Sequence, residues 1–271
     1  MQDKKINCVA IIQARMSSTR LPNKVLSDIC GIPLIQHIVN RLKDCKLVDK
    51  IVVATSTEKS DDILYEYCHK NLIDSYRGSL KNVLSRFIQV TEKYKPKYVV
   101  RVTGDCPLIY PEFIDKQIYI LNRDEGDLVK TNFDSSLLCG QGVLSTKTIK
   151  KVFEMSNDLE DFEHVGSKFI MKNPEKFKWV GLKLPKSFLK KNYRITVDEK
   201  KDLDFICMIY EELWDRKKNI DFNELISWLD SNKKIKSINS SVEDSLINQS
   251  IKELRKDLEI NLVSNYDWDK A

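Results

Sequence analysis

The residues best suited to chemistry stand in a basic loop that covers residues 13 to 24. The loop holds three cations with small hydroxyl residues between them: Arg15, Arg20 and Lys24, and Ser17, Ser18 and Thr19. Small residues let backbone N–H groups approach phosphate oxygens, and the cations neutralise phosphate charge. Arginine engages two phosphate oxygens in a planar fork, while lysine acts as a point charge. We therefore predict that this loop binds the triphosphate of a nucleotide.

The loop matches neither of two common phosphate-binding motifs. It lacks the G-x-x-x-x-G-K-[ST] pattern of a P-loop and the G-x-G-x-x-G pattern of a dinucleotide site. A solvated basic loop is the alternative interpretation. Three cations within ten residues, directly after the first predicted strand, favour phosphate binding.

Two aspartates at the ends of other predicted strands are candidates for a metal site. Asp105 follows the strand in R-V-T-G-D-C-P, residues 101–107, and Asp198 ends the segment T-V-D. Mg²⁺ prefers carboxylates together with substrate phosphates and water, so one or two acids suffice. Asp105 taken alone fits an ordinary turn or helix cap equally well, and Asp202 is expected to cap its helix. We predict that Asp105 and Asp198 bind one or two Mg²⁺ ions against the nucleotide phosphates.

The elements that must position these residues alternate regularly in the first half of the chain. Apolar runs predict strands at residues 7–13, 50–54 and 98–102, with a weaker one at 73–76. Helical spacing predicts helices between them, at 33–42, after a cap at Ser60–Asp62, at 82–94 and at 111–121. This alternation indicates right-handed βαβ units and a mostly parallel sheet. Ligands of such sheets bind beyond the carboxyl ends of the strands, where the basic loop and Asp105 lie.

The second half is less regular. Strands are expected at residues 128–131 and 142–144, at 177–184 as an edge strand, and at 193–197, which would deliver Asp198. Helices are expected at 148–155 and 202–214, followed from Asp221 by two or three lysine-rich helices that cover a sheet edge or form a dimer contact. We predict an α/β domain over residues 1–215 and a helical C-terminal extension over residues 216–271.

Composition excludes several classes of protein. The net charge is +5, from 45 basic and 40 acidic residues, and the lysines are interleaved with acids, so no nucleic-acid partner is expected. No apolar run reaches the ~18 residues of a membrane span, and the N-terminal apolar stretch 8–12 is too short for a signal peptide. Seven cysteines without C-x-x-C spacing and three separated histidines indicate reduced thiols and no zinc site. A cytoplasmic protein is expected.

The segment Ala10–Leu26, AIIQARMSSTRLPNKVL, resembles the opening signature of the sugar-acid cytidylyltransferases, which activate 3-deoxy-manno-octulosonic acid and acylneuraminate. The most similar branch is that of the spore-coat polysaccharide proteins of the SpsF type. Further matches follow in the same order and extend over roughly residues 8–210: ATS (54–56), RGS (77–79), NVLSRF (82–87), RVTGDCPLI (101–109), EHV (163–165) and TVDEKKDL (196–203).

This resemblance implies a fold, a reaction and a set of site residues. The fold is the α/β nucleotide-diphospho-sugar transferase type, which is GT-A-like and Rossmann-like. CTP is the donor, Mg²⁺ the cofactor, and a CMP-linked product forms as pyrophosphate leaves. Arg15 and Lys24 would contact the triphosphate, Asp105 would be the primary metal ligand and Asp198 the second. Catalysis then rests on positioning and charge stabilisation by Arg15, Lys24 and Asp105, without a covalent nucleophile.

The resemblance also assigns a nucleotide pocket. Ala14 and the strand end at Thr55 and Ser56 would border the cytosine. The residues expected to bind the nucleotide are Ala14, Arg15, Ser17, Ser18, Arg20, Lys24, Thr55, Ser56 and Thr103.

The acceptor side departs from the usual pattern of this branch. The segment Gly140-Gln141-Gly142 stands near a usual acidic position, and Phe162 replaces an arginine before E-H-V. We predict that Gln141 and His164 bind the acceptor, although His164 serves equally well to stabilise the fold. Asn23 stands where glycine is common, and asparagine tolerates a left-handed backbone.

Three functions remain open at this point. The first is transfer of CMP from CTP to a sugar acid or related acid for surface polysaccharide. The second is transfer to a non-sugar acceptor such as a phosphonate or a phosphorylated small molecule. The third is a glycosyltransferase-like protein that binds nucleotide sugars; Lys24 argues against it, because a sugar transferase has no triphosphate to neutralise. Both aspartates argue against an inactive scaffold. Relatives of this type are commonly dimers, so a homodimer is expected.

Overall fold

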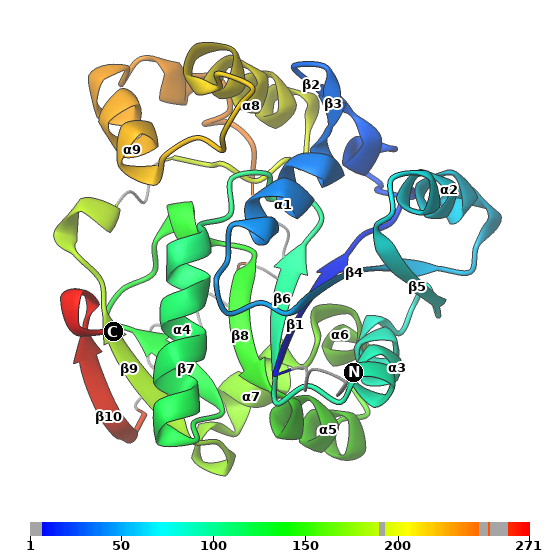
Figure 1. The fold of residues 1–271 in the computed structure, drawn as a ribbon, viewed down its shortest axis with the longest axis vertical. Coiled ribbons are helices and arrows are strands. Elements are labelled where there is room, and N and C mark those ends of the chain that lie inside the picture. The colour runs from blue at the N-terminus through cyan, green and yellow to red at the C-terminus, as the bar shows by residue number, and fades with distance from the viewer. Residues whose placement is uncertain (1–6, 190–192, 244–248, 250–259) are drawn as a thin grey trace, which may run out of the picture.

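The computed structural model describes residues 7–189, 193–243, 249 and 260–271. Within them, eight strands form one sheet in the order β10-β9-β7-β8-β6-β1-β4-β5 (Figure 1). The strands are β1 (Cys8–Gln13), β4 (Lys50–Ser56), β5 (Asp74–Gly78), β6 (Tyr98–Thr103), β7 (Leu128–Thr131), β8 (Gln141–Ser145), β9 (Trp179–Lys183) and β10 (Leu262–Asp267). A small hairpin of β2 (Asp28–Ile29) and β3 (Ile32–Pro33) stands apart.

The sheet is mostly parallel, as the alternating elements predict. Strand β1 pairs in parallel with β4 and β6, and β4 with β5. Strand β8 runs antiparallel to both β6 and β7, and the parallel pairs β7–β9 and β9–β10 complete the sheet. The carboxyl ends of β1, β4 and β6 therefore meet at one edge.

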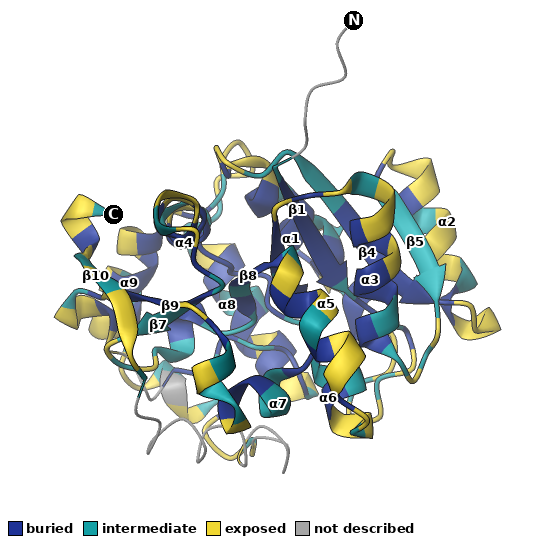
Figure 2. Cartoon of the chain, turned by 90° about the horizontal axis from the view of Figure 1, so that it is seen from below, coloured by how far each residue is buried: buried dark blue, intermediate teal, exposed yellow. Residues whose placement is uncertain are grey.

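Helices cover both faces of the sheet because the central strands are apolar on both sides. Alternate residues of β1 enter two different cores: Ala10 and Ile12 pack on one face, and Val9 and Ile11 on the other. The first core includes residues of α1 (Leu34–Lys43), α2 (Asp62–Lys70), α4 (Pro111–Asp124), α8 (Lys200–Leu213) and α9 (Phe222–Ser231). The second includes residues of α3 (Val83–Tyr94), α5 (Thr146–Met155), α6 (Leu159–His164) and α7 (Ser167–Lys172). Figure 2 shows the buried strands between helices whose outer faces are exposed.

The strand expected at residues 193–197 does not form. These residues are a loop without strand pairing, although Tyr193, Ile195 and Val197 are all buried in the first core. Their alternating pattern predicts a strand, but an extended loop that packs on a core buries the same alternate residues. The pattern therefore does not distinguish the two. The loop is held instead by single contacts, such as the Val197 N–H, which donates to the Asp105 carbonyl at 2.8 Å.

The C-terminal region is helical at α9, as predicted, but it also supplies a strand. Strand β10 pairs in parallel with β9 and forms the edge of the main sheet, so β9 is not the edge strand. Residues beyond the predicted boundary at 215 thus join the sheet of the α/β domain. Strand β10 was not expected because its residues are mostly exposed and carry no apolar run. Two or three lysine-rich helices were expected from Asp221 onward, and the part of that region at residues 244–248 and 250–259 lies outside the described residues.

No helix within the described ranges is both long and apolar enough to span a membrane.

Candidate active site

The basic loop and the end of β6 are packed tightly together at the carboxyl edge of the sheet. The Gly104 N–H donates to the Gln13 carbonyl at 2.9 Å. A Cβ atom at Gly104 would stand 2.9 Å from that carbonyl oxygen and 3.0 Å from the Ala14 Cβ. Only glycine permits this approach, which places Asp105 beside the basic loop.

Asp61 fixes the basic loop to the end of β4. Its fully buried carboxylate accepts the Met16 N–H at 2.7 Å, the Thr55 hydroxyl at 3.0 Å, and both the N–H and the hydroxyl of Ser56. Burial alone would raise the pKa of Asp61, but these four hydrogen bonds outweigh it and lower the pKa below its ordinary value. Asp61 precedes α2, as expected, but its side chain does not cap that helix. The buried hydroxyls and the loop N–H offer it stronger partners.

We expect Asp61→Asn to lower the free energy of unfolding by about 2 kcal/mol, because a neutral amide replaces a buried acceptor of four hydrogen bonds. The stabilisation that Asp61 contributes depends on pH. The folded pKa lies below the unfolded value of ~3.9, so the stabilisation is present above that pH and is lost as pH falls through the folded pKa. Urea denaturation at pH 7 and at pH 3 tests this. A gap between wild type and variant that did not shrink at pH 3 would contradict the assignment.

Lys24 lies at the centre of the site. Its Nζ donates to Asp105 Oδ2 at 3.1 Å, to Asp198 Oδ1 at 3.0 Å and to the Val197 carbonyl at 2.7 Å. It begins a short 3-10 helix, Lys24–Leu26, directly after Asn23, whose φ of 63° is left-handed. Asparagine accommodates that conformation, as predicted. The structure therefore brings the two predicted metal ligands and the predicted triphosphate lysine into one cluster.

The charges of this cluster stabilise one another. Burial alone lowers the pKa of Lys24, but the two carboxylates outweigh it and raise that pKa. Burial likewise raises the pKa of Asp105, but the Lys24 ammonium and the Thr103 hydroxyl hold it below its ordinary value. Lys24 and Asp105 are therefore both charged at neutral pH.

Two arginines complete the surroundings of Asp198. The other oxygen of its carboxylate contacts Arg20 Nη2 at 2.9 Å and also Arg194 Nη2. Arg194 Nε contacts Asp202 at 3.1 Å, and Asp202 accepts the N–H groups of Asp198 and Glu199. Asp202 forms a capping box with Glu199 at the start of α8, which confirms its expected capping role.

The donor set fits Mg²⁺. The carboxylates of Asp105 and Asp198 both contact the Lys24 ammonium, so they lie close enough together to share a cation. Carboxylates are the ligands that Mg²⁺ takes from proteins, with substrate phosphates and water at its remaining positions. In the described part of the chain, no three His, Cys, Asp or Glu side chains gather into a protein-only metal cage.

The other predicted nucleotide residues divide into surface and supporting positions. Ser17 is exposed and Ser18 is half-buried on the basic loop. The Ala14 N–H donates to the Ala54 carbonyl at 3.2 Å, which joins the loop to β4. The hydroxyls of Thr55 and Ser56 face Asp61 and therefore support the loop from below.

Arg15 reaches across to α6, where its Nη2 contacts Glu163 Oε1 at 3.1 Å. His164 follows on the same helix and is half-buried. Burial lowers the pKa of His164, and the nearby Arg101 lowers it further, so the imidazole is largely neutral at pH 7. Arg101 lies on β6 and donates from Nε to Gln13 Oε1 at 3.0 Å.

Gln141 and His164 are not brought together. Gln141 pairs with Val102 on β6. Val143, two residues further along β8 and therefore on the same face of the sheet, packs in the first core, whereas α6 covers the second core. The Gln141 side chain is buried and its Oε1 accepts the Tyr110 N–H at 2.7 Å. It is therefore tied to the start of α4, on the opposite face of the sheet from His164.

The sequence analysis assigned no role in the site to Asp61, Arg86, Arg101 or Arg194. Arg86 is 2% exposed and its Nη1 donates to the Ala54 carbonyl at 2.9 Å, beneath the loop. Burial lowers its pKa to about 10. The sequence contained a sign of this role. Arg86 stands among the apolar positions of its helix, where a cation needs a specific partner.

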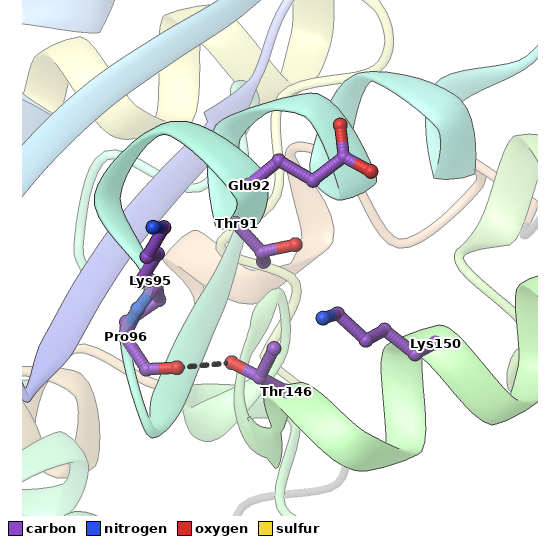
Figure 3. Close-up of a pocket in the computed structure, with 6 residues that line it drawn as sticks. All are labelled: Thr91, Glu92, Lys95, Pro96, Thr146 and Lys150. Carbon is purple, nitrogen blue, oxygen red and sulfur yellow. Dashed lines mark hydrogen bonds between the residues drawn. The ribbon is translucent and has the colours of Figure 1, made fainter.

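A separate cavity of 480 Å³ lies at the opposite end of the sheet. Figure 3 shows its lining at the end of α3 and the start of α5: Thr91, Glu92, Lys95, Pro96, Thr146 and Lys150. The Thr146 hydroxyl donates to the Pro96 carbonyl, just before β6 begins. The cavity is thus at the amino end of β6, away from the edge where α/β sheets bind ligands.

The family model that describes cytidylyltransferases matches residues 9–252. The chain belongs to the cytidylyltransferase family. The resemblance seen in the basic loop and the later motifs is therefore confirmed, and with it a nucleotidyltransferase activity. The loop and cluster described above belong to a cytidylyltransferase.

Two relatives align with most of this cytidylyltransferase, and a third aligns with about half of it. An uncharacterized protein of Methanocaldococcus jannaschii is 35% identical over 236 residues, 86% of this chain and 95% of that protein. The spore coat polysaccharide biosynthesis protein SpsF of Bacillus subtilis is 35% identical over 229 residues, 82% and 93% of the two chains. A 3-deoxy-manno-octulosonate cytidylyltransferase of Pelobacter propionicus is 33% identical over 150 residues, 54% and 56% of the two chains.

Solved structures confirm the fold. A cytidylyltransferase of Leptospira borgpetersenii superposes with a TM-score of 0.78 at 26% identity and covers 88% of this cytidylyltransferase and 100% of its own chain. A CMP:2-keto-3-deoxy-manno-octonic acid synthetase complexed with CTP has a TM-score of 0.56 at 14% identity over 76% of this chain and 99% of its own. The predicted Rossmann-like nucleotidyltransferase fold is therefore correct.

Proposed function

We propose that this cytidylyltransferase moves CMP from CTP to a small acidic acceptor, a sugar acid or a related acid, for surface polysaccharide synthesis. One observation carries the proposal: the Lys24 ammonium lies between Asp105 and Asp198 at the base of the basic loop. A lysine and two carboxylates in one place suit a triphosphate with its metal ion, and the named activities of the relatives support CTP as the donor.

The residues of the donor site have different roles in this proposal. Arg15, Arg20 and Lys24 bind the phosphates, and backbone N–H groups of the loop that Asp61 holds orient them. Asp105 and Asp198 would hold Mg²⁺, which neutralises charge on the phosphates when bound. Lys24 then donates to phosphate oxygens, and the acceptor oxygen attacks the α-phosphate while pyrophosphate leaves. Positioning and fixed charges carry the catalysis.

An open space beside Arg101 supports an anionic acceptor. Arg101 on β6 pairs with Gly142 on β8, and in the described part of the chain no atom outside residues 141–143 lies within 4 Å of the place where a Gly142 Cβ atom would stand. The space is flanked by the Arg101 guanidinium, and His164 lies near enough to both Arg101 and Arg15 to feel their charges. We assign the acceptor's acid group to Arg101, with His164 as a neutral hydrogen-bond donor.

The same arrangement suits a second class of acceptor. A guanidinium fork binds a phosphonate or phosphate as readily as a carboxylate. Gln141 and Phe162 stand where this branch usually has charged residues, and Gln141 is directed away from His164. A phosphonate or phosphorylated small molecule is therefore the alternative to a sugar acid.

Pyrophosphate release separates these possibilities. The assay combines each of the four nucleoside triphosphates with Mg²⁺ and with 3-deoxy-manno-octulosonate, N-acetylneuraminate, a phosphonate or a sugar phosphate. We expect release with CTP and one class of acid. Cleavage of a preformed nucleotide sugar without CTP turnover would overturn the proposal and restore the glycosyltransferase-like interpretation.

Arg101→Ala is expected to raise the KM of the active acceptor by about 10–100-fold, because a hydrogen bond to a charged group is lost. The KM of CTP should change little. Arg123→Ala, an exposed arginine on α4, is the matched control. Equal changes in both KM values would show that Arg101 supports the nucleotide site instead.

A further inference from the structure

Two cysteines lie together directly behind Asp105. The Cys106 Sγ contacts Asp105 Oδ1 at 3.5 Å and the Thr103 hydroxyl at 3.3 Å. It also lies 3.6 Å from the Thr196 hydroxyl, and the Cys139 Sγ lies 3.0 Å from the same atom. The two thiols therefore converge on Thr196, between the two aspartates of the site.

The backbone holds the two cysteines in register. The Thr103 N–H donates to the Gly140 carbonyl at 3.0 Å, which joins the end of β6 to the residue after Cys139. Gly140 has a φ of 67°, and a Cβ atom there would lie 2.4 Å from the Cys106 Sγ. The segment of Cys139 and Gly140 thus packs directly on Cys106, and only glycine leaves room for the thiol.

The two thiols differ in access. Cys106 is 4% exposed, whereas Cys139 is half-buried and is therefore the more accessible of the two to a small oxidant. The pKa of Cys139 is lowered because the Cys106 thiol hydrogen-bonds to it, with further help from the Thr196 hydroxyl, although burial opposes the shift. The thiolate is the form that reacts with peroxides.

The chain contains a natural comparison for this pair. Cys30 and Cys207 are also half-buried, and Cys30 lies close enough to Cys207 to raise its pKa. Burial raises the pKa of both, to about 11 for Cys207. Cys139, Cys30 and Cys207 are all half-buried, so a difference in the reactivity of Cys139 from that of the other two reflects its local environment.

We propose that Cys106 and Cys139 form a disulfide under peroxide, and that this bond switches off the donor site. Cys139 attacks the peroxide oxygen, so that a sulfenic acid forms and one water leaves. The Cys106 sulfur then attacks the Cys139 sulfur, the S–S bond forms, and the hydroxyl leaves as a second water. Two thiols are oxidised and one hydrogen peroxide is reduced to two waters. A dithiol reverses the change by exchange.

The bond would act on the donor site through Cys106. Its sulfur must approach Cys139 to a bond length of about 2 Å, which removes it from Asp105 and Thr103. Asp105 directly precedes Cys106 in the chain, and its carbonyl accepts the Val197 N–H, so both aspartate loops would be displaced. The effect on turnover rests on the proposed function, whereas formation of the bond does not.

The test treats the full reduced chain with hydrogen peroxide, alkylates the remaining thiols and maps the peptides by mass spectrometry. We expect a Cys106–Cys139 linked peptide that forms at least ten times faster than any Cys30–Cys207 link. Cys139→Ser and Cys106→Ser should each abolish it, and Cys30→Ser should not. Because Cys106→Ser alters a buried site, Cys139→Ser is the decisive variant.

Parallel samples are assayed for CTP binding and for pyrophosphate release. We expect peroxide to lower both at least tenfold in wild type and Cys30→Ser, with recovery in dithiothreitol, and to leave Cys139→Ser unaffected. Absence of the linked peptide, or a Cys30–Cys207 link in its place, would overturn the disulfide. A linked peptide with unchanged CTP binding would overturn the switch and leave the proposed function standing. A linked peptide in a chain that releases no pyrophosphate under any condition would count against the function alone.

Discussion

Asp105→Asn is expected to lower CTP turnover about 10³-fold, comparable to the loss of a single group that stabilises charge in a transition state. The substitution keeps the shape of the side chain and removes its charge. Asp105 is held close to Lys24 at 3.1 Å and is charged at neutral pH, so an amide cannot replace it as a ligand for a divalent cation. The affinity for CTP without Mg²⁺ should change much less than turnover.

Pyrophosphate release at saturating CTP, with Mg²⁺ varied, measures the effect. Asp127→Asn is the matched control, because Asp127 accepts the Ser145 hydroxyl and the Lys178 N–H at the opposite edge of the sheet. It should affect stability and leave turnover nearly unchanged. If Asp105→Asn retained more than a tenth of the wild-type rate, Asp105 would not be the primary metal ligand.

Lys24→Met should lower the free energy of unfolding by about 3 kcal/mol, because two carboxylates then lose their shared buried partner. The same change should weaken binding of CTP far more than binding of CMP, since the lysine neutralises the outer phosphates. Added Mg²⁺ should stabilise the variant more than the wild type, because the ion can take the place of the missing ammonium between Asp105 and Asp198.

Urea denaturation and calorimetric titration with CTP and CMP provide the measurements. Lys50→Met is the control: Lys50 pairs with Asp74, but both side chains are a third or more exposed, so this pair should contribute less than about 1 kcal/mol. Equal weakening of CTP and CMP binding would contradict the role assigned to Lys24.

The site was predictable where the chain is locally regular. Strand β1 and the basic loop follow one another directly, and β6 ends at Asp105, so the rule for parallel strands brings them together. Lys24 was expected at the phosphates and Asp105 and Asp198 at the metal, and the structure places all three within one cluster. Asp198 lies in the cluster although its predicted strand did not form. Val197, the preceding residue, is buried and its N–H donates to the Asp105 carbonyl, which positions Asp198.

The residues that the sequence did not reveal depend on contacts between distant segments. Asp61 has the pattern of a helix cap, and only the folded loop shows that it binds Met16, 45 positions away. Arg101 stands in an apolar strand, and its neighbour Gly142 becomes informative only when the register of β6 and β8 is known. Strand β10 depends on a pairing with β9, since its own residues carry no apolar pattern.

The carboxylate of Asp61 has a consequence for affinity. When a phosphate-binding loop becomes ordered only on binding its ligand, the loss of backbone freedom weakens the binding. Here the Met16 N–H and the end of β4 are tied to one buried group before any nucleotide arrives. The loop is therefore ordered during folding and is preorganised for the nucleotide. The interactions that the nucleotide makes then contribute to recognition and to the reaction.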